Sequence, residues 1–323
     1  MNAVSTTTLP PSRRDVVDSR VDNGFRWLVT GAGILVLVSL GAAALSMLWG
    51  GRLALEKFGI AFLWRDAWDP VQQDFGALVP IYGTLVTSLI AMVIAVPVSF
   101  GIAMFLTEIA PKWIRGPVGT AIELLAGIPS IIYGMWGLFV LVPFLATNVY
   151  PWVDANLGQI PGIGALFSGP PLGLGMGTAG LVLAIMVIPF ISSVMREVFL
   201  TVPGRLKESA YALGSTRTEV VWDVVLPYTR SAVIGGIFLG LGRALGETMA
   251  VTFVLGNAHR LTASLLEPGN SIAATIANEF AEADSPMYLS SLIALGFVLF
   301  LVTFVVLTIA RLMLRQLAKR EGN

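Results

Sequence analysis

Six long stretches of the chain contain almost no charged residues, and this pattern restricts the fold more than any other feature of the sequence. A helix needs about 20 mostly apolar residues to cross the hydrocarbon core of a membrane. The stretches lie between Arg26 and Arg52, between Asp74 and Glu108, between Glu123 and Asp154, in the later part of Asp154–Arg196, and over about Ser231–Leu255 and Met287–Ala310. We therefore predict an all-α, polytopic integral membrane protein with six transmembrane helices.

The overall composition agrees with this fold class and excludes several functions. Charged residues make up 12% of the 323-residue chain, against roughly 25% in soluble proteins. The net charge is zero, so no positive field favours nucleic acid as a partner. The sequence has no cysteine and one histidine, His259, which excludes disulfides, thiolate chemistry and a metal site built from several histidines.

The positions of lysine and arginine predict the orientation of the helices. If the N-terminus is cytoplasmic, 15 of the 20 Lys and Arg residues fall in cytoplasmic segments, four fall outside, and Arg243 lies within a helix. Cytoplasmic loops of membrane proteins carry an excess of these residues. We therefore expect both termini to be cytoplasmic, with a polar tail over residues 1–26 and a basic tail over residues 311–323.

Between these tails we expect two parts. Residues 27–79 hold the first transmembrane helix and an outer loop, and residues 80–310 hold a core of five helices. The outer loop at 145–172 is rich in Gly and Pro, which suits either a tight turn or a re-entrant gate. The acidic outer loop at 257–286 is either a solvated surface or a docking surface for a partner.

The longest cytoplasmic loop has the pattern of two short helices separated by a break. Pro203 is suited to begin the first helix, and Gly214 is suited to end it in the left-handed conformation. Thr216 and Glu219 have the spacing of a capping box for the second helix, which we expect Pro227 to end. Such a pair of helices forms a rigid projection that can enter a groove of another protein; the alternative is a loop with a structural role alone.

Two charged residues, Arg243 and Glu247, lie within the predicted fifth helix. An arginine at the centre of a membrane costs about 2.5–3.5 kcal/mol on insertion scales, so it normally faces protein or a water-filled path. Glu247 follows one turn later on the same face, and Gly236 and Gly240 lie within roughly 60° of the two charges. We therefore expect the charged pair to lie along a lane of small residues.

A second face of this helix carries Gly235, Gly242 and Gly246, and we expect it to pack closely against another helix, such as one of a partner subunit.

The chemistry of the charged pair suits the transport of an oxyanion. A guanidinium group offers paired hydrogen-bond donors that match two oxygens of phosphate. Glu247 can weaken the attraction between Arg243 and phosphate by pairing with Arg243 itself. Sulfate and arsenate carry similar oxygens and are alternatives. Sulfate is fully deprotonated whereas phosphate keeps a hydroxyl donor, so a nearby carboxylate favours phosphate over sulfate. The alternatives are a buried ion pair that fixes helix register and a proton relay in a secondary transporter.

The cytoplasmic loop, at about residues 201–228, resembles the EAA loop of ABC importer permeases. The usual motif is Glu-Ala-Ala, three residues, Gly, nine residues, Ile-x-Leu-Pro. Here it reads Glu208, Ser209, Ala210, then Gly214, then Val224, Leu226 and Pro227. In that family the loop docks into a cleft of the ATP-hydrolysing subunit. The resemblance therefore implies a role in ATPase coupling for Glu208, Ser209, Ala210, Gly214, Leu226 and Pro227.

Four further segments resemble the PstC-type permeases of the bacterial phosphate-specific transport system. They are residues 76–84, 128–134, 242–250 and 278–283, and the likeness extends over roughly residues 55–320. The resemblance implies a permease core over residues 80–310, and it assigns the Arg and Glu that match Arg243 and Glu247 to the anion path. It further implies four kinds of partner: a PstA-type permease, two copies of a PstB-type ATPase, a periplasmic phosphate-binding protein, and phosphate itself.

We therefore expect a multi-pass permease subunit in the bacterial cytoplasmic (inner) membrane that imports phosphate and is not itself an enzyme. The chain has no G-x-x-x-x-G-K-[ST] motif, so ATP and Mg belong on the partner ATPase, and we expect no cofactor in this chain. A scaffold that takes part in phosphate sensing without transport is the remaining alternative, because a signalling role leaves no residue signature.

Overall fold

The computed structural model describes residues 13–321 and divides into two units, one ending at Trp49 and one beginning at Gly50. The first unit consists of the long helix α1 (Arg13–Gly50), which ends at this boundary. Part of the predicted N-terminal tail, residues 1–12, lies outside the described residues, as do residues 322–323 of the C-terminal tail.

The second unit is built almost entirely from helices. Its long helices are α3 (Leu78–Met104), α8 (Met176–Leu200), α11 (Leu226–Leu245) and α14 (Pro286–Glu321). The shorter ones are α2 (Arg52–Phe58), α4 (Lys112–Ala126), α5 (Ser130–Trp136), α6 (Val142–Phe144), α7 (Tyr150–Asn156), α9 (Gly204–Ala212), α10 (Arg217–Val220), α12 (Met249–Leu255) and α13 (Ile272–Glu279).

Shorter irregular elements complete the second unit. Two 3-10 turns are η1 (Gly59–Leu63) and η5 (Gly164–Leu166). Four π-helical turns are η2 (Phe105–Ile109), η3 (Gly137–Leu141), η4 (Leu145–Val149) and η6 (Val221–Val225). The strands β1 (Trp68–Asp69) and β2 (Asp74–Phe75) form a short antiparallel ladder in which Trp68 is opposite Phe75.

Six segments of the described residues are long and apolar enough to cross a membrane. They are Asp22–Gly50, Leu78–Ile109, Ser130–Asn156, Met176–Leu200, Arg217–Leu245 and Pro286–Leu314. This confirms the predicted fold class and the predicted number of transmembrane helices. The cytoplasmic position of both termini stays a prediction.

The core of the second unit forms where α3 packs against α8. A side chain added at Gly180 of α8 would meet Ile90 of α3 at 2.6 Å, so the two backbones approach closely. The Ser99 hydroxyl of α3 also donates to the Ile188 carbonyl of α8 at 3.1 Å. Lipid tails are as apolar as leucine, so close packing and interhelical hydrogen bonds of this kind hold membrane helices together.

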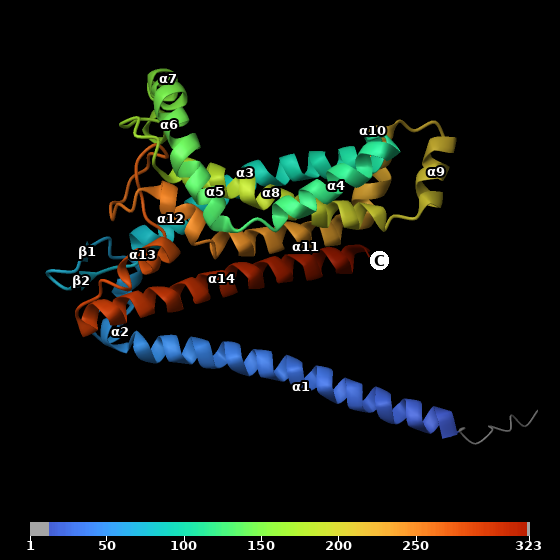
Figure 1. Cartoon of the computed structure of the whole chain (residues 1–323), viewed down its shortest axis with the longest axis horizontal. Helices are drawn as coiled ribbons and strands as arrows, with labels where there is room; N and C mark the ends of the chain where they lie inside the picture. The colour runs from blue at the N-terminus through green and yellow to red at the C-terminus, as the bar shows by residue number, and fades with distance from the viewer. Residues whose placement is uncertain (1–12, 322–323) are drawn as a thin grey trace, which may run out of the picture. The chain divides into compact units, whose positions relative to one another are not determined.

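The short elements gather at two opposite ends of the long helices (Figure 1). The helices α9 and α10 lie at one end, whereas α12, α13 and the β1–β2 ladder lie at the other. The loop that we expect in the cytoplasm and the loops that we expect outside are therefore separated by the length of the bundle.

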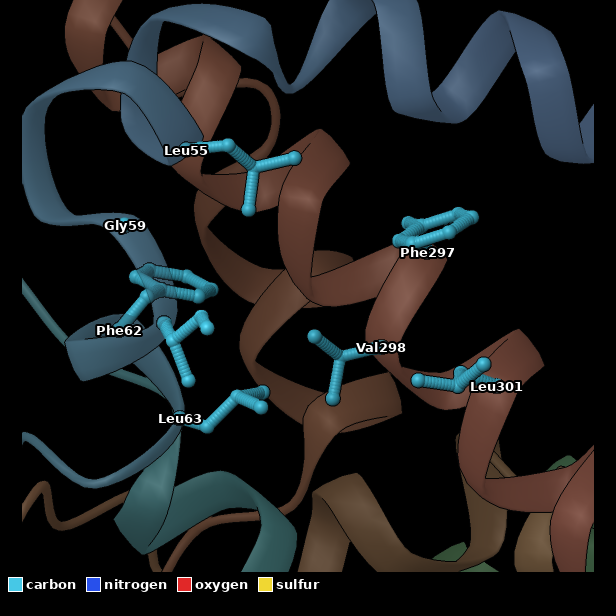
Figure 2. Close-up of a pocket in the computed structure, with 8 residues that line it drawn as sticks. Leu55, Gly59, Phe62, Leu63, Phe297, Val298 and Leu301 are labelled. Carbon is cyan, nitrogen blue, oxygen red and sulfur yellow. The ribbon is translucent and has the colours of Figure 1, made fainter.

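The first outer loop folds back onto α14 (Figure 2). Phe62 of η1 is fully buried, and the Ala54 N–H of α2 donates to the Ser290 hydroxyl of α14 at 3.3 Å. Figure 2 shows Leu63 and Val298 on the two sides of a groove of about 300 Å³, whose lining is entirely apolar. The loop is thus packed as part of the second unit.

The second helix of the cytoplasmic loop does not end at Pro227, contrary to our prediction. The helix α10 continues through the π turn η6 into α11, and Pro227 lies in the first turn of α11. The π turn is closed by the Leu226 N–H, which donates to the Val221 carbonyl five residues earlier. A wider turn accommodates a proline, which lacks an N–H and clashes with the preceding turn of a regular helix. One continuous span, Arg217–Leu245, results.

The fifth transmembrane helix was predicted over about Ser231–Leu255, but α11 ends at Leu245. After a short break the helix resumes as α12 at Met249. Tertiary packing accounts for the break, because α12 lies against α5. A side chain added at Gly134 of α5 would meet the Ala250 Cα atom at 3.0 Å, so the backbones of α5 and α12 approach closely.

The predicted lane of small residues on α11 is a helix contact and not an open path. Side chains added at Gly236 and Gly240 would meet Val194 at 2.8 Å and Ile191 at 2.6 Å, both on α8. The two glycines allow α11 to approach α8, which is the usual role of small residues between membrane helices. The predicted lane of small residues beside Arg243 is therefore present on α11, and it packs against the same helix, α8, that Arg243 contacts through Phe190.

Candidate functional site

The cytoplasmic loop begins with α9, whose end is closed by local hydrogen bonds. Pro203 precedes the helix, and Gly214 follows it with a φ angle of 92°. The Gly214 N–H donates to the Tyr211 carbonyl at 3.0 Å, and the Ser215 N–H donates to the Ala210 carbonyl at 3.2 Å. These two bonds form a Schellman motif, which satisfies carbonyls that the helix end leaves free. The predicted beginning and end of this helix are confirmed.

The second helix begins with the predicted capping box. The Glu219 N–H donates to the Thr216 hydroxyl at 3.4 Å, and the Thr216 N–H donates to the Glu219 carboxylate at 2.7 Å. Both sides of the break between the two helices are therefore fixed by hydrogen bonds between near neighbours. The loop is consequently a rigid projection, as the sequence predicts.

An ion pair ties the projection to the end of the second transmembrane span. Lys207 Nζ of α9 lies 2.6 Å from Glu108 Oε1 of η2, and the two side chains are only 17% and 7% exposed. Removing one member of a buried pair leaves the other charge uncompensated, which is strongly destabilising. This pair was not predicted from the sequence. The only indication of this pair in the sequence is a single carboxylate, Glu108, directly after an apolar stretch.

The motif residues of the loop divide between the core and the surface. Ala210 and Leu226 pack against the hydrophobic core, whereas Glu208, Ser209, Gly214 and Pro227 are exposed.

Exposed apolar side chains accompany Glu208 on the projection. Leu213 is 88% exposed and Leu206 is 43% exposed, and such groups on a short helix mark a surface for protein contact. The hydroxyl of Ser209, which replaces the usual alanine, donates to the Arg205 carbonyl at 2.8 Å. The extra oxygen is therefore satisfied within α9 and does not alter the projection.

Arg243 lies in the last turn of α11, directly before the break. Its guanidinium carbon is 5.5 Å from the centre of the Phe190 ring of α8, a cation–π contact. The residue is half-buried. A cation near the C-terminal end of a helix is also favoured by the helix dipole.

Glu247 lies in the break itself and not one turn along the same helix. Its carboxylate accepts from the Ala250 N–H at 3.4 Å, which satisfies a donor at the start of α12. Among the interactions of the described residues, no ion pair joins Glu247 to Arg243. The predicted alignment of the two charges on one helical face is therefore wrong, because it assumed a continuous helix.

The outer end of α3 receives the loop that precedes α13. A Cβ atom at Gly83 would overlap the Asn270 carbonyl oxygen, so only glycine admits the loop at this point. The Ile272 N–H also donates to the Thr84 hydroxyl at 3.0 Å. These contacts bring the family segment at 76–84 against the outer loop at 257–286.

A partly buried carboxylate, Glu279 of α13, joins the outer loops to one another. Its Oε2 atom accepts from Trp68 Nε1 at 2.7 Å and from the Tyr288 hydroxyl at 2.6 Å. Its Oε1 atom lies 2.7 Å from His259 Nε2, and the Trp68 and His259 rings stack with centroids 5.1 Å apart. The carboxylate thus joins Trp68 of the first outer loop to His259 and Tyr288, which flank α13 in the sequence.

The hydrogen bonds keep Glu279 charged. Burial raises the pKa of Glu279, but the hydrogen bonds from His259, Tyr288 and Trp68 outweigh burial and hold the pKa below the ordinary value of 4.5. From the sequence, Glu279 could not be distinguished from the exposed acidic residues of the same outer loop. The residue type alone does not show whether a carboxylate in a polar loop is buried or solvated.

Solved structures of ABC transporters share this fold. A chain of a bacterial alginate ABC transporter in complex with its alginate-bound periplasmic protein matches with a TM-score of 0.62 at 17% identity, over 92% of this chain and 97% of that chain. A second structure of a bacterial ABC transporter that imports alginate gives a TM-score of 0.60 at 18% identity, over 93% and 99%. This chain therefore shares the fold of these transporter structures.

Relatives by sequence identify the family to which the chain belongs. Residues 99–320 match the family described as "Binding-protein-dependent transport system inner membrane component". The "Phosphate transport system permease protein PstC" of Xylella fastidiosa is 66% identical over 98% of this chain and 97% of its own length. The proteins of the same name from Pasteurella multocida and Haemophilus influenzae are 57% and 50% identical, over 93% and 98% of this chain and 93% and 100% of their own lengths. This chain belongs to that transport family and, within it, to the PstC-type permeases, which confirms the resemblance drawn from its motifs.

Proposed function

We propose that this chain is the permease subunit through which an ATP-driven importer moves inorganic phosphate across the bacterial cytoplasmic membrane. The observation that carries the proposal is Arg243, a half-buried guanidinium at a helix break within a membrane-spanning bundle. No carboxylate among the described residues forms an ion pair with it. The names of the PstC-type relatives supply the substrate.

The chemistry of Arg243 suits a site that binds phosphate and then releases it. A guanidinium group presents paired N–H donors to two phosphate oxygens. Irregular backbone at membrane depth occurs where it is buried in protein or lines a water-filled cavity, and the break after Leu245 is backbone of this kind. The Phe190 ring interacts with the positive charge of Arg243 through a cation–π contact. This contact competes with phosphate for the guanidinium group and keeps the anion from being held too tightly.

Glu247 is the second residue that we place on the anion path. Its contact with the Ala250 N–H is long, at 3.4 Å, so the carboxylate is held weakly. In our proposal it leaves this contact as phosphate departs, and it then competes for the guanidinium of Arg243.

The cytoplasmic loop couples this path to ATP hydrolysis. Glu208, Ser209, Ala210, Gly214, Leu226 and Pro227 are the residues that we assign to contact with the ATPase. The loop runs through η6 into α11 without interruption, so the span Arg217–Leu245 joins the docking surface to the turn that carries Arg243. At 1.5 Å per residue this span is about 40 Å long. A displacement of the loop is therefore transmitted to Arg243 along one element.

The remaining assignments concern partners. A permease of this family functions with a partner permease, an ATPase and a binding protein, which we assign as a PstA-type permease, two PstB-type ATPases and a periplasmic phosphate-binding protein. ATP and Mg then reside on the ATPase, this chain is not an enzyme and holds no cofactor, and both of its termini are cytoplasmic. The protein is a multi-pass integral membrane protein, which we place in the inner membrane.

Radiolabelled phosphate uptake tests this proposal in cells that lack their own copy of the subunit. With equal membrane levels and assembly, Arg243→Gln should lower uptake about tenfold or more, because hydrogen bonds to a charged group contribute about 1.5–3 kcal/mol. The matched control is Arg65→Gln, which removes an exposed arginine paired with Asp74 and should leave uptake unchanged. Normal uptake by assembled Arg243→Gln would show that the arginine is structural and that phosphate takes another route.

A further inference from the structure

A groove of about 360 Å³ lies between α8, α11 and α14. Its floor is formed by Gly235 and Gly236, and its walls include Leu239 and Leu307. The lining is apolar apart from one charged residue, Arg311 of α14. The groove therefore combines a space suited to hydrocarbon with a single exposed cation.

The groove opens near one surface of the membrane. Arg311 lies close to the end of the span Pro286–Leu314, and Val194 of the lining lies in the last third of the span Met176–Leu200. A long arginine side chain in this position can place its head group at the membrane interface. In the proposed orientation this interface belongs to the cytoplasmic leaflet.

The glycine face that was expected to pack against a partner helix is not continuous. A side chain added at Gly235 would meet nothing within 4 Å, but Gly242 is covered by Leu307 of this chain at 3.5 Å. The open part extends along α11 only from Ala232 to Leu239, which is about 10 Å. A partner helix laid on this face would also bury the charge of Arg311, which is costly in a membrane.

We propose that this groove binds one phospholipid with an anionic head group. Its acyl chain fills the space over Gly235, and its phosphate pairs with the guanidinium of Arg311. Guanidinium groups bind phosphate through two parallel hydrogen bonds, and basic pockets between transmembrane helices bind anionic head groups. The choice of leaflet rests on the proposed orientation, but retention of the lipid does not depend on phosphate transport.

Native mass spectrometry of the whole complex tests this site. The complex is placed in nanodiscs of equal phosphatidylglycerol and phosphatidylcholine, and the retained lipids are counted. We expect wild type to retain phosphatidylglycerol preferentially and Arg311→Gln to lower that preference about fivefold, as expected for one basic residue near a lipid surface. Gly235→Leu should fill the groove and lower retention of both lipids.

Two variants serve as matched controls. Lys112→Gln removes an exposed cation at the start of α4, and Gly101→Leu adds a side chain to α3 where nothing lies within 4 Å of the new Cβ atom. Neither should change the retained lipid.

Three results would overturn the proposal. Unchanged lipid preference together with unchanged total retention in Arg311→Gln would exclude a head-group contact. Loss of the partner permease from Gly235→Leu with unchanged lipid would make the groove a protein interface. Release of the bound lipid by inorganic phosphate would show that Arg311 holds the free ion instead.

Discussion

The two ends of the span Arg217–Leu245 are built in different ways. At the end that follows α9, the hydrogen bonds that shape the loop join close neighbours, such as Gly214 to Tyr211 and Thr216 to Glu219. At the other end, the break is shaped by contacts between distant residues, such as Arg243 with Phe190. The comparison indicates that the loop owes its shape to its own sequence, whereas the end that carries Arg243 owes its shape to the whole fold.

The largest effect should come from breaking a long-range contact at the outer end. In Gly83→Ala the new methyl group would overlap the Asn270 carbonyl oxygen, so the loop before α13 must move. We expect the free energy of unfolding to fall by about 3 kcal/mol or more, measured by thermal unfolding of the purified complex. Gly101→Ala adds the same methyl group to α3 in open space and is the control. Equal stability of the two variants would contradict the described packing.

A smaller effect should follow from removing the charge of Glu279. We expect Glu279→Gln to destabilise the outer loops by about 1.5–3 kcal/mol at pH 7, because the hydrogen bonds that the carboxylate accepts are charge-assisted. The pKa of Glu279 is below the ordinary value of 4.5 in the folded protein. Its contribution to stability is therefore complete above about pH 4.5 and is lost as the pH falls through the lower, folded-state pKa.

The melting temperatures of wild type and Glu279→Gln should therefore differ most at neutral pH and converge in acid. Glu282→Gln removes an exposed carboxylate three residues later and should melt like wild type at each pH. A constant difference between wild type and Glu279→Gln across this range would show that the charge of Glu279 is not what stabilises the network.

The smallest effect should come from the cytoplasmic loop, where only local geometry is disturbed. Gly214 has a φ angle of 92°, and a side chain added there would meet nothing within 4 Å. Gly214→Ala should therefore cost only about 1 kcal/mol of conformational energy and speed amide exchange at the end of α9 about fivefold. Gly204→Ala, at the start of α9, should not change this exchange. A global loss of stability in Gly214→Ala would show that the loop is not an independent local structure.

The same comparison explains what the sequence could predict. The six transmembrane helices follow from the charge-free stretches, because the bilayer demands a fixed length of apolar helix. The break at Gly214 and the capping box at Thr216 follow from local rules. The passage of α10 into α11 could not be predicted, because Pro227 normally signals the end of a helix and the π turn that accommodates it has no marker in the sequence.

Long-range geometry was also outside the reach of the sequence. Arg243 could be identified because a charge within an apolar stretch is conspicuous. The position of Arg243 relative to Glu247 could not be predicted, because the end of α11 depends on how α12 packs against Gly134 of α5. The pair of Lys207 and Glu108 and the network around Glu279 were missed for the same reason, since each joins segments that only the fold brings together.

The central claim is that one span joins a coupling surface to a phosphate site. The most direct test is the amount of phosphate moved per ATP hydrolysed in proteoliposomes that contain the whole complex and its binding protein. We predict that Arg243→Gln keeps ATP hydrolysis and lowers this ratio about tenfold, whereas Glu208→Arg loses hydrolysis and transport together. A wild-type ratio in Arg243→Gln would contradict the claim, because the phosphate path would then not include the end of α11.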